Sequence, residues 1–178
     1  MAESRPDRSF PLHGTALVTG ASSGLGTHYA EFLARAGMDL VLVARSVDAL
    51  HELAAGIEQR HGRTPVVLPT DLTDRAARGA LLEELLARGI AVDVLMNNAG
   101  FGTKGDFATL DPDRVIREIE LNCVALTHLA RAMLPGMLER GHGAIINIAS
   151  TAGFQPWPTM SVYGATKASV RSFSQALW

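Results

Sequence analysis

Residues 15–26 have the sequence TALVTGASSGLG, an apolar run followed by a turn that holds three glycines. The run Thr15–Thr19 predicts a buried strand, and apolar residues then recur at helical spacing. Glycines between a strand and a helix let the backbone turn tightly and approach an anion, which the free N–H groups of the helix N-terminus can bind. The spacing is Gly20-x3-Gly24-x-Gly26, not the commonest Gly-x-Gly-x-x-Gly of dinucleotide sites. A turn without any ligand is therefore the alternative.

Strand-like and helix-like segments alternate through the rest of the chain. Apolar runs without polar interruption predict strands that are covered on both faces. The further expected strands are 40–44, 65–68, 93–96 and 144–149, and the expected helices after the first are 47–60, 74–88, 111–140 and 160–178. This alternation predicts an α/β fold with a doubly wound parallel sheet.

The composition is that of a globular domain, with 47% hydrophobic and 19% charged residues and a net charge of −2. The length of 178 residues suits one domain, and the charge gives no argument for binding nucleic acid. Residues 1–14 are polar and lack the apolar run of a signal peptide, and no window is long enough to span a membrane. We expect a flexible tail at 1–14, a domain at 15–178 and a cytoplasmic location.

Metal binding and disulfide formation are not expected. The six histidines are scattered without metal-ligand spacing and are expected at the surface or its boundary. The single cysteine, Cys123, has no partner within the chain and is expected to be a small core residue.

Tyr163 and Lys167 lie four residues apart in the last expected helix, in a chain with two tyrosines and two lysines. This spacing places both side chains on one helix face. An ammonium beside a phenol favours the ionised phenol, which makes a tyrosine usable as an acid or base near neutral pH. The alternative is an ordinary solvated helix turn.

Arg45 follows the second expected strand, after Ala44. An acidic residue at this place would bind ribose hydroxyls and repel a 2′-phosphate. An arginine suits a phosphate instead, so the residue favours NADP over NAD. The alternative is that Arg45 only ends the strand in solvent.

Further motifs follow the expected strands in chain order: Asp71-Leu72 after the third, Asn97-Asn98-Ala99-Gly100 after the fourth, and Ser150 at the end of the fifth. Asn122 lies in the long helix. Together with the glycine turn and the Tyr163/Lys167 pair, these motifs resemble the short-chain dehydrogenase/reductase family over about residues 15–178. The resemblance implies a Rossmann-type sheet with strand order 3-2-1-4-5.

The resemblance also implies catalytic roles. Tyr163 would be the acid/base at the substrate oxygen, and Ser150 would hydrogen-bond the substrate carbonyl. Lys167 would favour ionisation of Tyr163 and hold the nicotinamide ribose hydroxyls. Asn122 would hold a water that links Lys167 to solvent as a proton relay.

The implied cofactor site lies along the same edge of the sheet. Asp71, with Leu72 beside it, would contact the adenine, and the asparagine loop would line the adenosine side. The implied cofactor-binding residues are Gly20, Ser22, Ser23, Gly24, Leu25, Gly26, Arg45, Asp71, Leu72, Asn98, Ala99, Gly100, Tyr163 and Lys167. No metal is implied.

The implied reaction is hydride transfer between a nicotinamide and a carbonyl or secondary alcohol. Residues 98–102 are similar to the NADP-linked ketone and 3-oxoacyl reductase branches. The apolar side chains Phe101, Phe107, Phe154, Trp157 and Met160 form either a wall for an apolar substrate or core packing under a loop. A methyltransferase with a similar glycine turn is an alternative, but methyl transfer needs neither the Tyr163/Lys167 pair nor the asparagine loop.

Family members continue beyond the last helix with a sixth strand, a turn and lid over the nicotinamide, and a seventh strand, none of which is in residues 1–178. The strand at 144–149 would then form an open sheet edge. We expect a truncated, weakly active reductase, with an inactive nucleotide-binding fragment as the alternative. The helices at 111–140 and 160–178 could form a homo-oligomer.

Overall fold

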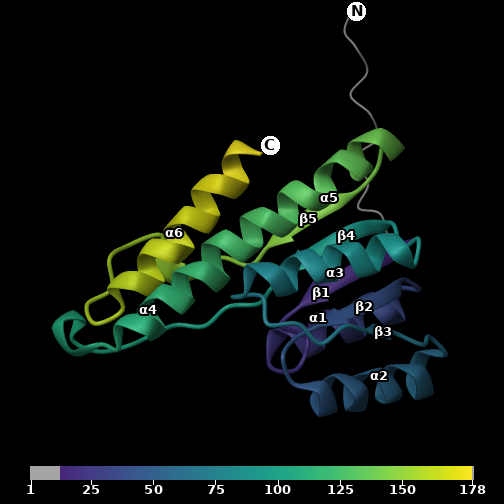
Figure 1. The fold of residues 1–178 in the computed structure, drawn as a ribbon, viewed down its shortest axis with the longest axis horizontal. Helices are drawn as coiled ribbons and strands as arrows, with labels where there is room; N and C mark the ends of the chain where they lie inside the picture. The colour runs from purple at the N-terminus through teal and green to yellow at the C-terminus, as the bar shows by residue number, and fades with distance from the viewer. Residues whose placement is uncertain (1–12, 178) are drawn as a thin grey trace, which may run out of the picture.

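The computed structural model describes residues 13–177 and contains, within them, one five-stranded parallel sheet (Figure 1). The strands are β1 (Thr15–Thr19), β2 (Asp39–Val43), β3 (Val66–Val67), β4 (Val92–Asn97) and β5 (Ala144–Asn147). Their order is β3-β2-β1-β4-β5, and each neighbouring pair is parallel. This confirms the predicted Rossmann-type topology. The predicted tail at 1–14 lies outside the described residues except for its last two.

Helices connect the strands at nearly all the places that the sequence pattern predicts. They are α1 (Leu25–Arg35), α2 (Val47–His61), α3 (Arg75–Ala87), α4 (Pro112–Ile119), α5 (Leu126–Arg140) and α6 (Ser161–Ala176). Short 3₁₀ helices occupy Phe107–Thr109 and Thr151–Gly153. The helix predicted at 160–178 thus ends at Ala176, and Trp178 is outside the described residues.

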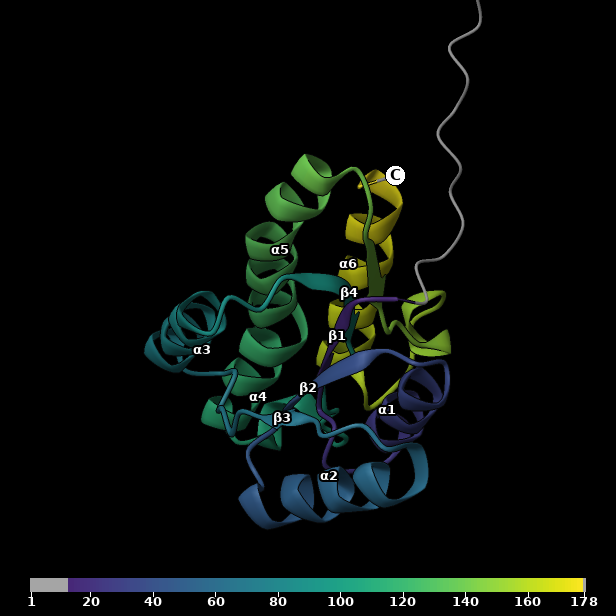
Figure 2. The ribbon, with the colours of Figure 1, turned by 90° about the vertical axis from the view of Figure 1, so that its right-hand side faces the viewer.

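The two faces of the sheet carry two separate apolar cores, because successive strand residues point to opposite sides. Ala16 and Val18 of β1 pack in the core that α1 and α2 cover. Leu17 of β1 packs in the other core, which receives residues of α3 and α5. Figure 2 shows α3 and α5 on the opposite side of the sheet from α1. The sheet is therefore doubly wound.

β5 is an edge strand of this sheet within the described residues. All six residues of β4 are buried, whereas all four of β5 are only partly buried. Ile145, Ile146 and Ile148 are likewise partly covered, as the open-edge prediction expects.

The helical region predicted at 111–140 has the correct extent but is not one regular α-helix. α4 and α5 are joined without a break by a π-helix at Glu120–Ala125, which contains Asn122. Pro135 does not end α5, which continues to Arg140. Single π turns occur often at functional sites, where they re-aim one side chain.

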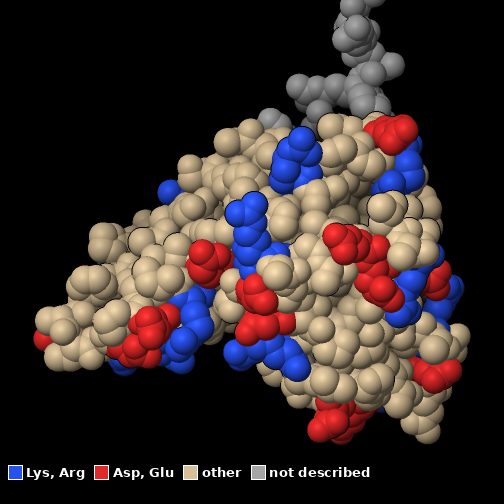
Figure 3. Space-filling view, viewed as in Figure 1, with Lys and Arg blue, Asp and Glu red and all other residues tan. Residues whose placement is uncertain are grey.

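Acidic and basic side chains are interspersed on the face seen in Figure 3. Residues 13–177 contain no group of three or more potential metal ligands and no helix that is long and apolar enough to cross a membrane. Cys123 is only partly buried, so the prediction of a core residue is wrong. Burial still raises the pKa of its thiol, which argues against a reactive thiolate.

Candidate active site

The glycine turn and the asparagine loop are bonded directly to each other at the carboxyl ends of β1 and β4. The Thr19 hydroxyl, 1% exposed, accepts hydrogen bonds from the N–H groups of Asn98 and Ala99, both at 3.0 Å. The Asn98 side-chain amide in turn donates to the carbonyls of Thr19 and Gly20. The two loops therefore form one rigid unit. The asparagines are not simple turn residues, and the bonding role of Thr19 was missed because a threonine ending a buried strand has no distinctive pattern.

The glycines of the turn are required by the backbone. Gly20 has φ +66° and Gly24 has φ +57°, a region that other residues rarely adopt. A Cβ on Gly26 would overlap the Gly20 carbonyl oxygen, so α1 begins directly against the turn. Ser22 is partly exposed, and Ser23 and Leu25 are exposed. The N-terminal end of α1 is thus open to an anion.

Asp71 lies in the loop after β3, close enough to Arg45 to feel its charge. Its carboxylate accepts hydrogen bonds from the backbone N–H and the hydroxyl of Thr73, at 3.0 and 2.8 Å. Burial opposes ionisation of Asp71, but the Thr73 bonds and the charges of Arg45 and Arg117 outweigh it and hold its pKa below the ordinary value. The N-cap of α3 is Asp74, whose side chain accepts from the Ala76 N–H. The Asp71 carboxylate instead orders the loop after β3.

Asn122 connects three segments from its place in the π-helix. Its side chain is 1% exposed and donates to the Phe101 carbonyl at 2.8 Å and to the Thr166 hydroxyl at 3.0 Å. Its Oδ1 accepts from the Phe101 N–H at 3.1 Å. Both amide hydrogens are used by the protein, so only Oδ1 has capacity for another group. The sequence did not identify Thr166, which also donates to the Tyr163 carbonyl at 2.9 Å.

Lys167 is buried in the same place, with only 5% of its surface exposed. Its ammonium donates to the Ile148 carbonyl at 2.6 Å and lies 5.9 Å from the centre of the Tyr163 ring. Burial lowers the pKa of Lys167. A Cβ on Gly100 would lie 2.8 Å from Asn122 Oδ1 and 3.5 Å from Lys167 Nζ. The asparagine loop, the π-helix and α6 therefore meet around the lysine.

Ser150 follows β5, and Tyr163 lies in the first turn of α6. The Ser150 hydroxyl oxygen accepts from the Ala152 N–H at 3.2 Å and begins the 3₁₀ helix there. This bond uses an oxygen lone pair and leaves the O–H free to rotate. The partly buried Tyr163 ring packs against Gly102 of the loop after β4.

The Gly102 contact gives a testable expectation. A Cβ at Gly102 would lie 2.9 Å from Tyr163 Cδ2 and 3.1 Å from Cγ, so Gly102→Ala must move the ring. We expect turnover to fall about three- to tenfold, the cost of holding one side chain off its preferred rotamer. Gly79→Ala is the matched control, because a Cβ there meets nothing within 4 Å. Steady-state rates that are equal for the two variants would contradict the contact.

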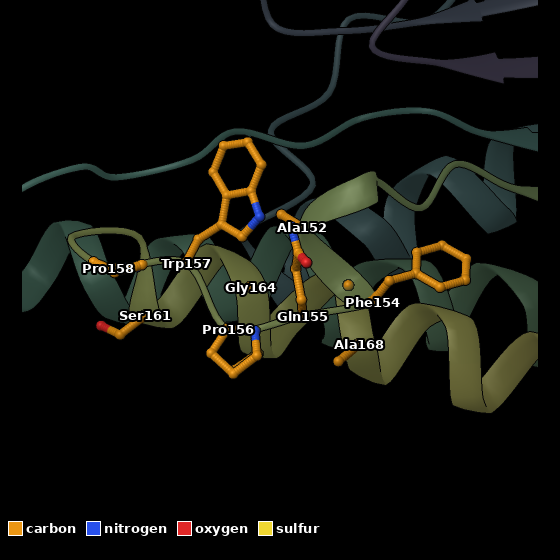
Figure 4. A pocket seen from close by; sticks show the side chains of 11 residues that line it. Ala152, Phe154, Gln155, Pro156, Trp157, Pro158, Ser161, Gly164 and Ala168 are labelled. Atoms are coloured by element: carbon orange, nitrogen blue, oxygen red, sulfur yellow. The ribbon is translucent and has the colours of Figure 1, made fainter.

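An apolar hollow of about 640 Å³ lies between α6 and the loop before it. Figure 4 shows Phe154, Pro156 and Trp157 of the loop beside Gly164 and Ala168 of α6. Phe154 is 69% exposed and Trp157 42%, so the core-packing alternative is wrong for both. Tyr163 and Ser150 do not line this hollow, because α6 turns Tyr163 to a different face.

The five apolar residues that the sequence groups into one wall are therefore divided among different places. Phe107, 64% exposed, lines a second hollow of about 420 Å³ with Ile119 and Val162. Phe101 lies under the guanidinium of Arg114, 4.9 Å from its ring centre. Met160 lines neither hollow. The prediction of one continuous wall is not confirmed by the described residues.

Comparison with known proteins gives consistent matches. The family model described as short chain dehydrogenase matches residues 14–178. The very-long-chain 3-oxoacyl-CoA reductase of Bos taurus is 37% identical over 166 residues, which are 91% of this chain and 53% of that protein. The chain thus spans about half the length of this protein and of similar curated relatives.

Solved structures match equally well. A short-chain dehydrogenase from Sphingobium yanoikuyae in complex with NADPH is 46% identical, with a TM-score of 0.87 over 92% of this chain and 64% of that one. The bulky-bulky ketone specific alcohol dehydrogenase from Comamonas testosteroni is 41% identical, with a TM-score of 0.87 over 92% and 65%. With the family model covering nearly the whole chain and its motifs on the expected strand ends, the chain belongs to the short-chain dehydrogenase family of oxidoreductases.

Proposed function

We propose that the protein is an NADP(H)-dependent oxidoreductase that transfers hydride between the nicotinamide and a carbonyl or secondary alcohol. The observation that carries this proposal is the buried Lys167 ammonium on the same helix face as Tyr163, with Asn122 and Gly100 beside it. The structural-neighbour complex with NADPH supports the choice of cofactor. The proposed cofactor-binding domain is the region 15–178.

The residues present fit a dinucleotide. The glycine turn lets a pyrophosphate approach the N-terminus of α1, and Gly26 allows no side chain between them. Arg45, exposed after β2, would hold a 2′-phosphate by charge-assisted hydrogen bonds. Asp71 and the asparagine loop would contact the adenosine, and Lys167 the nicotinamide ribose.

The cofactor supplies the hydride, while the protein must position the substrate and move one proton. Tyr163 would give that proton to the substrate oxygen in reduction and remove it in oxidation. The rotatable Ser150 O–H would hydrogen-bond the same oxygen and stabilise the charge that develops there. Asn122 Oδ1 would hold a water that links the Lys167 ammonium to solvent and relays the proton.

The cofactor preference is tested by Arg45→Asp. We expect the ratio of NADP(H) to NAD(H) affinity to fall by about 10- to 100-fold, the value of one or two hydrogen bonds to a charged group. Arg35→Asp, at the end of α1, controls for the change in net charge. The two dissociation constants are measured by nicotinamide fluorescence. An unchanged ratio in Arg45→Asp would reject the 2′-phosphate contact.

The substrate that we propose is an apolar ketone or 3-oxoacyl compound, since relatives include an enzyme named for bulky ketones and one named for 3-oxoacyl-CoA. We also propose that the helices at 111–140 and 160–178 form a homo-oligomer. Ile116, Ile119 and Val124 are exposed apolar residues of that region and would be covered in it.

A further inference from the structure

Arg78 of α3 is buried on the side of the helix that faces the core, where an apolar side chain is usual. Only 3% of its surface is exposed, and Leu81 and Leu85 on the same helix belong to the apolar core. A buried guanidinium is costly unless its donors are paired. The groups that pair with the donors of Arg78 therefore indicate the role of this side chain.

Those partners lie on three different segments. Its Nη1 donates to the Leu72 carbonyl at 2.5 Å, in the loop after β3. Its Nε donates to His128 Nδ1 on α5 at 3.3 Å, and Nη1 lies 3.8 Å from the Glu120 carboxylate in the π-helix. Because an arginine Nε only donates, His128 must present a lone pair at Nδ1 and carry its proton on Nε2. His128 and Glu120 thus fix the orientation of the guanidinium.

The Leu72 carbonyl belongs to the same peptide unit as the Thr73 N–H. That N–H is one of the two donors that orient the Asp71 carboxylate, at 3.0 Å. A peptide unit is planar and rigid, so a group that holds its carbonyl also sets the direction of its N–H. Arg78 consequently controls, through one peptide, the carboxylate that faces the proposed adenine site.

We propose that Arg78 is a positioning residue for the adenine subsite, held by His128 and Glu120 and acting through the Leu72–Thr73 peptide on Asp71. This rests on the proposed function, in which Asp71 contacts the adenine. A carboxylate accepts a hydrogen bond from the 6-amino group of adenine but is repelled by the 6-oxygen of hypoxanthine. By orienting Asp71, Arg78 therefore helps the protein to recognise the 6-amino group of adenine.

The experiment compares binding of NADPH and of its deamino analogue, which has hypoxanthine in place of adenine, by nicotinamide fluorescence. The unaltered protein is expected to prefer NADPH about tenfold, the value of one hydrogen bond to a charged group. In Arg78→Met, which keeps the volume and the apolar surroundings, this preference is expected to fall to about twofold or less, while the melting temperature stays within about 4 °C. A residue with only a structural role would change the melting temperature and leave the preference intact.

Arg88→Met is the matched control, because Arg88 is the C-cap of the same helix and is paired only with the partly exposed Glu84 among the described residues. It should retain the full preference. If Arg78→Met does not fold, Arg78→Lys keeps a cation there, but a lysine cannot reproduce the planar fork that serves Leu72 and His128 together. That variant is expected to lose at least half of the preference.

The outcomes separate the two proposals. An unaltered protein that does not bind NADPH, or binds it without preferring adenine, overturns the proposed adenine site and this inference with it. An unaltered protein that prefers NADPH, together with folded Arg78 variants that prefer it equally, overturns the positioning role alone.

Discussion

Tyr163→Phe is expected to reduce turnover by about 10³-fold, within the range that one positioned acid or base contributes. The substitution removes the phenolic O–H and keeps the ring that packs against Gly102. The affinity for NADPH should stay within about threefold, because cofactor binding does not need that proton. The measurement is the NADPH-dependent reduction of an apolar ketone, with cofactor affinity determined separately by fluorescence.

The other tyrosine of the chain provides the control. Tyr29 on α1 packs against the core formed with α2, on the opposite face of the sheet from α3 and α5. Tyr29→Phe should leave turnover within about twofold of the unaltered protein, since no side-chain hydrogen bond joins Tyr29 to a proposed site residue among the described residues. Equal rates for the two variants would show that the acid/base is another group.

Lys167→Met is expected to lower kcat/KM by about 10²- to 10⁴-fold. The same substitution is expected to remove the stability cost of burying a charge, and so to change how stability depends on pH. The loss of activity follows from removing the ammonium near Tyr163 and its proposed ribose contact. The stability effect follows from burial, which lowers the pKa of Lys167 in the folded protein. The lysine of the unfolded chain has an ordinary pKa of about 10.4.

Between these two pKa values the unfolded chain binds more protons at this site than the folded protein does. The free energy of unfolding therefore rises with pH through that window, and below the folded-state pKa the full cost of the buried charge is present. The stability of the unaltered protein relative to Lys167→Met should accordingly increase as the pH is raised towards about 10.4. Urea unfolding at a series of pH values, without cofactor, measures this difference.

Lys104→Met is the control for Lys167, since Lys104 is the other lysine and is exposed in the loop after β4. It should lose neither activity nor stability. A relative stability of Lys167→Met that is independent of pH, or that moves in the other direction, would show that the ammonium is not penalised by burial.

The fold was predictable because its determinants are local. Uninterrupted apolar runs specify the buried parallel strands, and the glycine turn requires left-handed backbone at Gly20 and Gly24. The residues at the strand ends follow from this topology, because parallel strands bring their carboxyl ends to one edge. This explains why the positions of Arg45, Asp71 and Ser150 could be given in advance.

The features that the sequence did not predict depend on contacts between residues that are far apart along the chain. The π-helix at Glu120–Ala125 accompanies the bonding of Asn122 to Phe101, twenty-one residues earlier, and no local pattern encodes such a contact. Thr19 and Thr166 likewise act through partners on other segments. Arg78 did have a usable signal, because it shares a helix face with Leu81 and Leu85. The single substrate wall is not confirmed, because apolar composition does not say which neighbours each of the five residues packs against.

The central claim is that Tyr163 assists hydride transfer from bound NADPH to a carbonyl carbon, and isotope transfer tests it most directly. The protein is incubated with NADPH deuterated at nicotinamide C4 and with an apolar ketone, and the alcohol formed is analysed by mass spectrometry. One deuterium is expected on the carbinol carbon, with labelled alcohol formed about 10³-fold more slowly by Tyr163→Phe and at an unchanged rate by Tyr29→Phe. NADPH binding without any labelled alcohol, or labelled alcohol formed by Tyr163→Phe at the rate of the unaltered protein, would contradict this role of Tyr163.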